Sequence, residues 1–189
     1  MTKAEILDAA AQIFSEKGYH ATSMQDIAAA VNLQKASLYH HINSKQEILV
    51  ALLDQALDML IAALQAVQER PLPPDEKLRL AMRTYLEIIA DNGNLATVLL
   101  LEHRSLDAKL RKRHIPRRDR FEGIWREIIA EGKRAGVFDC EDVNMAAKAL
   151  IGSLNWTIMW YRPDGKLNMA QIAAVNADLF INGLHVHPH

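Results

Sequence analysis

Apolar residues recur at a spacing of three and four along almost the whole chain, and this periodicity constrains the fold more than any other feature. Ile6, Ala10, Ile13 and Phe14 show it first, and later segments repeat it. No segment alternates Val, Ile and Thr as a strand would, and aromatic residues make up only 6% of the chain. The sequence therefore predicts an all-α fold of about nine helices.

Gly, Pro, Asn and Ser residues mark the ends of these helices. Gly18 follows the first helix, and Asn32 stands in a turn where it would tolerate a left-handed backbone. Ser44 and Glu47 match a capping box, which opens a long helix that ends before Pro71. The predicted helices lie at residues 5–17, 24–31, 35–42, 44–69, 76–91, 95–103, 115–135, 141–161 and 169–184.

The first three predicted helices are short, and the second and third are joined by a turn of a few residues, which is typical of a helix-turn-helix. In that motif two helices hold the third at the surface, where it can enter the major groove of DNA. We therefore predict a helix-turn-helix DNA-binding domain at residues 1–47. A long helix joins it to a C-terminal helical bundle at residues 48–189.

The predicted third helix begins with Gln34, Lys35, Ala36 and Ser37. Short side chains at this end would let the helix approach the edges of the bases. Tyr39, His40 and Lys45 follow, and each can donate a hydrogen bond to a phosphate.

The order and spacing of residues 22–28, 33, 37–42 and 44–49 resemble the DNA-binding signature of the TetR family of regulators. The resemblance covers about residues 5–50. It implies a homodimeric one-component repressor that binds a palindromic operator, with an N-terminal helix-turn-helix and a larger helical effector domain. Asn32 stands where the family usually has glycine, and Ile42 where it usually has phenylalanine, and neither departure touches the DNA-facing surface.

Carried over by position, the resemblance assigns two sets of DNA contacts. The base-reading set comprises Lys35, Ala36 and Ser37, to which we add the adjoining Gln34. The phosphate-binding set comprises Thr22, Ser23, Tyr39, His40 and Lys45.

The charge of the predicted DNA-binding domain is unusual for its role. Residues 1–47 contain four lysines and five acidic residues, a net charge of −1, and the whole chain is nearly neutral with 22 Lys and Arg against 23 Asp and Glu. Because phosphate neutralisation supplies much of the affinity for DNA, we expect weak binding by a single copy and a modest dependence on salt. A polybasic DNA-coating protein is excluded.

Positive charge gathers instead at residues 104–120, where eight Lys and Arg face two Asp, a net charge of +6. One interpretation is a solvated face at a helix junction that is broken at Pro116. The other is an anion site formed by Arg111, Arg117 and Arg118, since guanidinium groups suit phosphates. Phe121 and Trp125 follow on an apolar face, and a polyanionic head beside apolar side chains is what an acyl-CoA would require.

Residues 145–161 are apolar almost all round, so the predicted helix should be buried on both sides. We expect one side to face its own domain and the other a second copy, in a homodimer formed by the last two helices. Asn155, Trp156 and Trp160 also resemble a TetR branch that answers to acyl-CoA and controls fatty-acid or sterol breakdown. We predict these three residues in the effector pocket, with another amphipathic ligand as the open alternative.

The remaining signals point away from catalysis. Cys140 is the single cysteine, and the alternating His185, His187 and His189 resemble a mobile tail more than a metal site, so we predict no catalytic residue, no metal and no cofactor. No apolar run is long enough to span a membrane, and we expect a cytoplasmic protein without a membrane partner. The competing hypothesis is a helical lipid-binding or acyl-CoA-binding protein, or an enzyme, that does not bind DNA.

Overall fold

The computed structural model describes residues 2–185, and in this range it is helical, as predicted. A single isolated β-bridge, between Phe138 and His185, is the only strand-like pairing of these residues. His187 lies outside the described residues, as does His189. The helices are α1 Lys3–Lys17, α2 Met24–Ala30, α3 Lys35–Leu38, α4 Lys45–Gln68, α5 Pro74–Asp91, α6 Gly93–Leu101, η1 His103–Ser105, α7 Ala108–Arg134, α8 Val143–Trp160 and α9 Met169–Leu184.

The chain forms two compact units. Unit 1 comprises residues 1–58 and 92–117, and unit 2 comprises residues 59–91 and 118–189. Two helices, α4 and α7, contribute one part to each unit. The predicted boundary after residue 47 stays a prediction, but the fold places more of the chain beside the first three helices than the sequence suggested.

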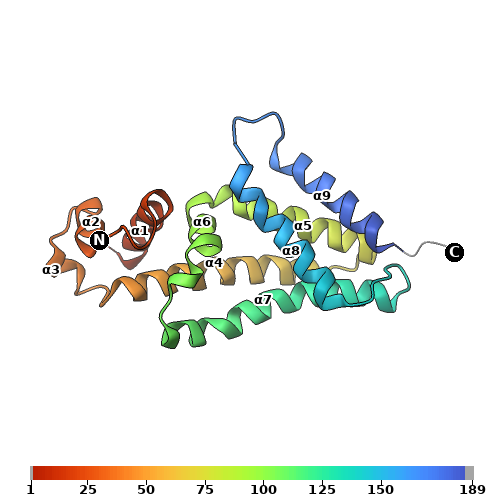
Figure 1. Cartoon of the computed structure of the whole chain (residues 1–189), viewed down its shortest axis with the longest axis horizontal. Helices are drawn as coiled ribbons and strands as arrows, with labels where there is room; N and C mark the ends of the chain where they lie inside the picture. The colour runs from red at the N-terminus through yellow and green to blue at the C-terminus, as the bar shows by residue number, and fades with distance from the viewer. Residues whose placement is uncertain (1, 186–189) are drawn as a thin grey trace. The chain divides into compact units, whose positions relative to one another are not determined.

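In unit 1, α2 packs against α1 and α3, and α6 lies against α1 (Figure 1). The core is mainly aliphatic, and its buried aromatic residues are Phe14 and Tyr19. Ile6, Phe14, Ile27, Leu38 and Ile48 are each at most 1% exposed. This packing explains why a helix of only four residues, α3, is held in place: its single buried side chain, Leu38, is completely enclosed.

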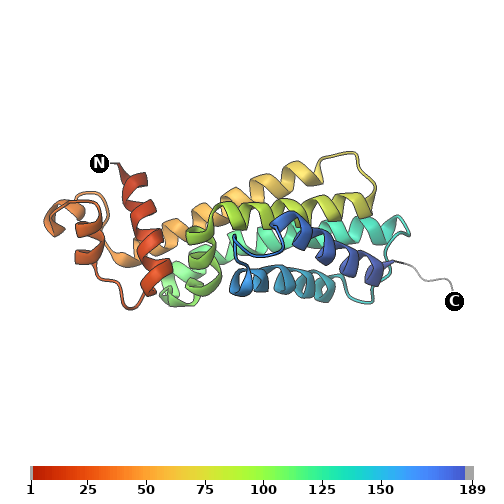
Figure 2. The same cartoon turned by 90° about the horizontal axis from the view of Figure 1, so that it is seen from above.

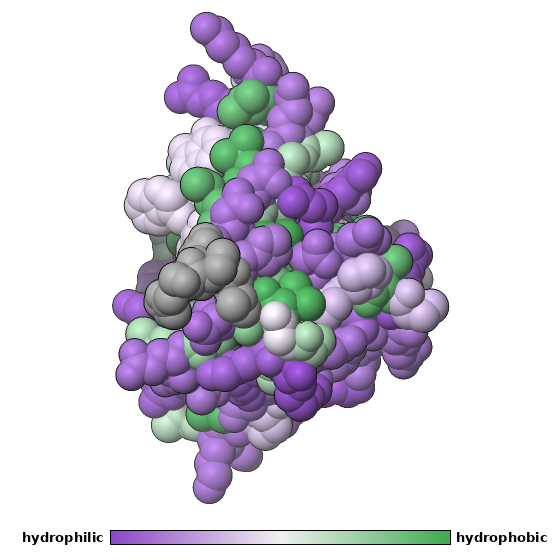
Figure 3. Space-filling view, turned by 90° about the vertical axis from the view of Figure 1, so that its right-hand side faces the viewer, coloured by the Kyte–Doolittle hydropathy of each residue, from purple (hydrophilic) through white to green (hydrophobic). Residues whose placement is uncertain are grey.

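In unit 2, α5 packs along α9, and α8 lies beside both helices, as Figure 1 and Figure 2 both show. Tyr85 of α5 and Trp125 of α7 are the largest side chains of the core. Gly132 of α7 allows the Phe138 ring to come close, since a Cβ at that position would lie 2.1 Å from the ring. The end of the molecule drawn in Figure 3 is mainly hydrophilic, with hydrophobic side chains in small separate groups.

Helix ends follow the capping signals of the sequence. Ser44 Oγ accepts from the backbone N–H of Glu47, and Asn168 forms a reciprocal capping box with Gln171. Gly18 ends α1 with a φ of 83°, and Asn32 has a φ of 53° in the turn after α2, so the left-handed conformation expected for the asparagine is confirmed. None of the helices in residues 2–185 is both long and apolar enough to cross a membrane.

Two helix predictions were wrong. The helix predicted at residues 35–42 ends at Leu38, because the N–H groups of His40 and His41 bond to carbonyls three residues back and tighten the chain into a turn. The helix predicted from residue 115 begins at Ala108, where Asp107 caps it by accepting from the backbone N–H of Leu110 at 2.8 Å.

Pro116 therefore does not break the chain at a helix junction but lies inside α7. Proline removes a backbone donor and crowds the preceding turn. Side chains on both sides of it hold α7 against α4. His114 Nδ1 lies 2.8 Å from Asp54 Oδ1, and Arg117 Nη1 lies 3.0 Å from Asp54 Oδ2. These contacts explain why the helix continues through the proline.

Candidate DNA-binding surface and effector region

The helix α2 is anchored by a hydrogen-bonded cap. Asp26 accepts from the backbone N–H of Ser23 at 2.7 Å and from its hydroxyl at 2.6 Å, and the Ser23 hydroxyl accepts from the Asp26 N–H. The Ser23 hydroxyl bond, more than any other contact, holds the pKa of Asp26 below its usual value. This cap fixes the start of α2, and α2 and the turn that follows it determine the position of α3.

The residues predicted to read bases lie on the outer side of α3. Gln34, Lys35 and Ala36 are exposed, and Ser37 is half-buried. Leu38 points into the core and is completely buried. Because the buried residue orients the helix, the polar and short side chains that precede it face solvent.

The residues predicted to bind phosphates fall into two groups. Ser23, Tyr39 and His40 are exposed, and Tyr39 retains 43% of its surface. Thr22, in contrast, is 2% exposed, and its hydroxyl donates to the carbonyl of Gly18 at 2.9 Å. The first group is open to a ligand in solvent, whereas the Thr22 hydroxyl already serves the fold.

Lys45 belongs with Thr22 in this respect. Its ammonium group donates to the carbonyls of Tyr19 and Thr22, at 2.8 and 2.6 Å, and lies 4.3 Å from the centre of the Tyr19 ring. Lys45 therefore ties the start of α4 to the loop between α1 and α2. Burial, more than any other factor, raises the pKa of Tyr19 above its usual value, so the phenol stays neutral beside the lysine.

A polar cluster that was not predicted joins residues 102–107 to the loop between α1 and α2 and to the first turn of α4. The Gln46 amide donates to the Tyr19 hydroxyl and to the Ser105 carbonyl, both at 2.8 Å, and accepts from the backbone N–H of Asp107 at 2.9 Å. Glu102 accepts from the backbone N–H of Tyr19 at 3.0 Å. No local pattern identifies such contacts, because the partners are 27 to 83 residues apart.

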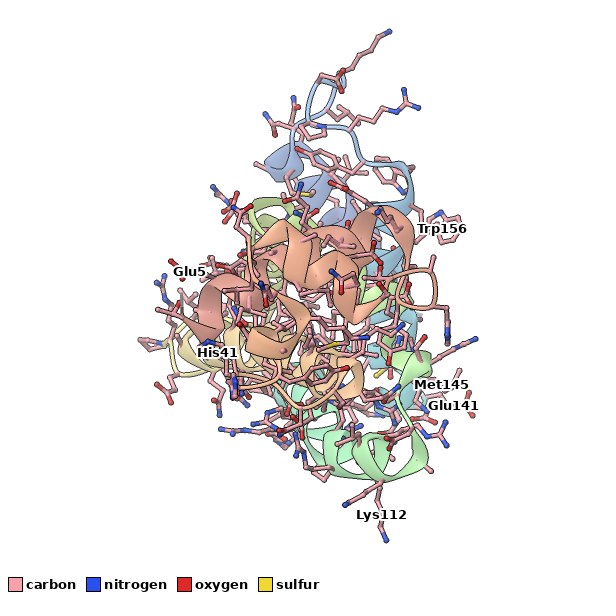
Figure 4. The ribbon with its side chains drawn as sticks, turned by 90° about the vertical axis from the view of Figure 1, so that its left-hand side faces the viewer. Glu5, His41, Lys112, Glu141, Met145 and Trp156 are labelled. Carbon is pink, nitrogen blue, oxygen red and sulfur yellow. The ribbon has the colours of Figure 1, made fainter. Side chains whose placement is uncertain are left out.

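The basic stretch at residues 104–120 is only partly neutralised within the chain. Arg117, one of the predicted anion ligands, is paired with Asp54 and donates to Asp58 at 2.7 Å. Arg111 and Lys112 are exposed and have no acidic partner among the described residues, and Lys112 projects away from the ribbon in Figure 4. The acidic partners were missed, although two aspartates four residues apart in the apolar helix α4 are a readable signal.

Within unit 2, Arg118 lies near two acidic groups: its guanidinium is 3.7 Å from Asp119 and 3.6 Å from Glu122. Phe121 and Trp125, by contrast, come together in the interior. Their ring centroids are 6.4 Å apart, and Trp125 is completely buried.

Asn155 reaches this aromatic cluster from α8, because its side-chain oxygen accepts from the hydroxyl of Tyr85 at 2.5 Å. Tyr85 itself contacts both rings, with centroid distances of 5.9 Å to Phe121 and to Trp125. Tyr85 was not predicted, although it is the one aromatic residue on the apolar face of α5 and could have been singled out on that ground.

The other two predicted pocket residues, Trp156 and Trp160, do not join the cluster. They are 64% and 48% exposed on the opposite side of α8. In Figure 4 Trp156 projects outward from the ribbon. In the single chain, therefore, only one side of α8 is buried, and the expected burial of its other side is not seen.

Other reactive side chains form no recognisable centre. Within residues 2–185, no three His, Cys, Asp or Glu side chains gather as a metal site would require. His185 stacks on the Phe138 ring at 6.2 Å between centroids. The half-buried Cys140 has no disulfide partner in the described part of the chain.

An exposed short helix, held by a buried three-helix frame in an otherwise all-α chain, defines the class of helix-turn-helix DNA-binding proteins. Comparison with known families agrees. The family described as "Bacterial regulatory proteins, tetR family" matches residues 6–52, and "Tetracyclin repressor-like, C-terminal domain" matches residues 71–184. The chain belongs to the TetR family of transcriptional regulators.

Similar proteins extend over nearly the whole chain. The TetR family transcriptional regulator PfmR from Thermus thermophilus is 40% identical, with a TM-score of 0.87 over 96% of this chain and 99% of that one. The HTH-type transcriptional repressor KstR2 of Rhodococcus jostii (strain RHA1) is 28% identical over 189 residues, 99% of this chain and 92% of that protein. AibR, solved with isovaleryl coenzyme A and operator DNA, is 29% identical with a TM-score of 0.85 over 97% of each chain.

Proposed function

We propose that this TetR-family regulator is a repressor that binds a palindromic operator as a homodimer and leaves it when an acyl-CoA binds. The observation that carries the DNA-binding part is the outer side of α3, where Gln34, Lys35 and Ala36 face solvent on a helix anchored by Leu38. Ser23, Tyr39 and His40 are exposed near it in sequence and are suited to phosphate oxygens. We place its action on DNA in the cytoplasm, without catalysis.

DNA binding is tested by fluorescence anisotropy with the duplex upstream of the protein's own gene. Removing a base contact should cost about 1–3 kcal/mol, so Lys35→Ala is expected to weaken operator binding about tenfold and to leave binding to random DNA unchanged. Lys166→Ala removes an equally exposed lysine from the loop between α8 and α9 and serves as the matched control. Equal operator affinity of all three proteins would contradict the assignment of α3.

Dimerisation is supported by an unpaired apolar stripe on the last two helices. Met145, Trp156 and Met159 of α8 are 53% to 64% exposed, and Val175 and Leu179 of α9 are 55% and 69% exposed. Met145 and Trp156 project from the same side of α8 in Figure 4. Exposed apolar side chains that follow helical spacing mark a helix–helix interface, and a two-fold dimer would bury the stripe of each copy against the other.

The proposed effector class is supported by the interior of unit 2 and by two relatives. The cluster of Tyr85, Phe121 and Trp125 offers apolar surroundings to an acyl chain. AibR was solved with isovaleryl coenzyme A and DNA, and KstR2 is a transcriptional repressor. Release requires that the ligand bind more tightly to the state that has left DNA.

The effector is tested by titrating acyl-CoA thioesters of increasing chain length into the labelled operator complex. Anisotropy should fall to the value of free DNA for a subset of chain lengths, and free coenzyme A should have little effect. If no thioester releases the DNA at saturation, the effector class is wrong, while the DNA-binding proposal remains open to its own test.

A further inference from the structure

The interior of unit 2 contains a polar atom that its own side chains do not satisfy. Trp125 is completely buried, and its indole nitrogen has no hydrogen-bond partner among the described residues. Buried polar groups are almost always paired, and an unpaired buried donor costs about 1–3 kcal/mol. Because the indole N–H only donates, the group that it suits must be an acceptor.

The neighbours of Trp125 cannot supply that acceptor. The ring of Tyr85 lies across that of Trp125, at 5.9 Å between centroids, and the Tyr85 hydroxyl donates to the Asn155 oxygen. Burial raises the pKa of Tyr85 far above its usual value, so its hydroxyl keeps its proton. With its oxygen engaged, Asn155 presents amide hydrogens that have no partner in the described part of the chain. The cluster is therefore rich in donors and poor in acceptors.

The charge balance of the interior restricts the acceptor further. Lys77 is the buried cation of unit 2 among the described residues, at 5% exposure. Its ammonium group already donates to both carboxylate oxygens of Glu131, at 2.8 and 2.9 Å. An ionised group without a partner is costly to bury. A neutral oxygen therefore fits the Trp125 cluster better than a carboxylate or a phosphate.

We propose that Trp125 donates its indole hydrogen to the carbonyl oxygen of the effector's thioester, with the Asn155 amide as a second donor near it. This inference rests on the proposed acyl-CoA effector and adds a chemical criterion to it. Unit 2 recognises the ester carbonyl and not only the length of the acyl chain, so a ligand of the same length without that oxygen is rejected.

A pair of ligands tests the proposal on the unaltered protein. Decanoyl-CoA and its thioether counterpart S-decyl-CoA differ by one carbonyl oxygen. Calorimetry is expected to show about tenfold tighter binding of the thioester, the effect of one hydrogen bond in a buried site. In a nitrogen-15 spectrum the chain gives three tryptophan indole signals. That of Trp125, assigned by its loss in Trp125→Phe, should move downfield with the thioester and not with the thioether.

Variants distinguish a hydrogen bond from packing. Trp125→Phe removes the donor and should reduce the thioester preference to about one, whereas Phe121→Leu disturbs the same cluster without removing a donor and should weaken both ligands alike. Equal binding of the two ligands by the unaltered protein, or an unmoved Trp125 signal, would overturn this inference alone. If neither ligand binds and no other thioester releases the operator, the acyl-CoA effector is overturned together with this inference.

Discussion

Single side chains fix the geometry on which the candidate DNA-binding surface depends. Leu38 orients α3, Asn32 makes the turn before it, and the Ser23–Asp26 cap begins the helix before that turn. Each of these roles was readable from residue type and local spacing. Lys45 shows the limit of such reading, because its contacts with the carbonyls of the α1–α2 loop depend on residues 23 and 26 positions away.

The Asp26 cap predicts a pH-dependent contribution to stability. Because the pKa of Asp26 is below 3.8 in the folded chain, its contribution is complete above that pH and is lost as the pH falls through the lowered value. Asp26→Asn should therefore be less stable than the unaltered protein at neutral pH, and the difference should vanish in acid. Urea unfolding across pH measures it, with Asp8→Asn on the exposed side of α1 as the control. A difference that persists unchanged at low pH would contradict the role of this carboxylate.

Thr157 predicts the opposite sign of effect. It is 1% exposed, and its hydroxyl has no partner within the described residues. Thr157→Val keeps the shape and removes the unpaired group, so the free energy of unfolding should rise by about 1–2 kcal/mol. Thr97→Val is the matched control, because the Thr97 hydroxyl donates to the Gly93 carbonyl at 2.9 Å and no gain is expected there. A loss of stability in Thr157→Val would show that its hydroxyl is paired.

At the level of helices, the apolar periodicity predicted the existence and order of α1 to α9, while the starts and ends depended on chemistry that the periodicity does not report. The start of α7 was missed because charged residues hide its apolar pattern, although Asp107 is a readable cap. The continuation through Pro116 was not predictable locally, since it depends on Asp54 of α4. Phe121 and Trp125 are four residues apart on one face of α7, so their proximity was readable from the sequence, whereas Tyr85 reaches them from α5.

Pro116 should therefore reduce the stability of α7. Pro116→Ala restores a backbone N–H that can bond to the carbonyl of Lys112. The change also frees the unfolded chain from the restriction that proline places on it, and this offsets part of the gain. We expect the free energy of unfolding to rise by about 1–2 kcal/mol in total. Circular dichroism during urea unfolding measures the change. Ile115→Ala, at the neighbouring exposed position, should change the free energy of unfolding by less than about 0.5 kcal/mol. No gain in Pro116→Ala would mean that the helix is already adapted to the missing donor.

At the level of the whole molecule, the proposed function requires two copies, because a helix-turn-helix dimer places its reading helices about 34–36 Å apart, one turn of DNA. The apolar stripe on α8 and α9 is exposed in the single chain, and a second copy would bury it. Unit 1 carries ten Lys and Arg against nine Asp and Glu, a net charge of +1. A dimer makes twice as many phosphate contacts as a single copy, and this compensates for the low net charge of unit 1.

Gly152 offers a selective test of the dimer. It is exposed within the α8 stripe, and a Cβ there would meet nothing within 4 Å in the single chain. A glycine inside a helix costs about 0.5–1 kcal/mol relative to alanine, so Gly152→Leu should fold with full helicity but weaken the dimer at least tenfold by preventing close approach of the two copies. Sedimentation equilibrium measures this, with Lys166→Leu as a control that adds the same side chain in the α8–α9 loop. Unchanged association of Gly152→Leu would place the interface elsewhere.

Whether paired copies of α3 read an operator is decided by in vitro selection of bound sequences from a pool of random duplex DNA. We expect an enriched inverted repeat whose half-sites are centred about one helical turn apart, with the preferred bases altered by Lys35→Ala. Enrichment of no sequence, or of a single unrepeated site that Lys35→Ala leaves unchanged, would contradict it.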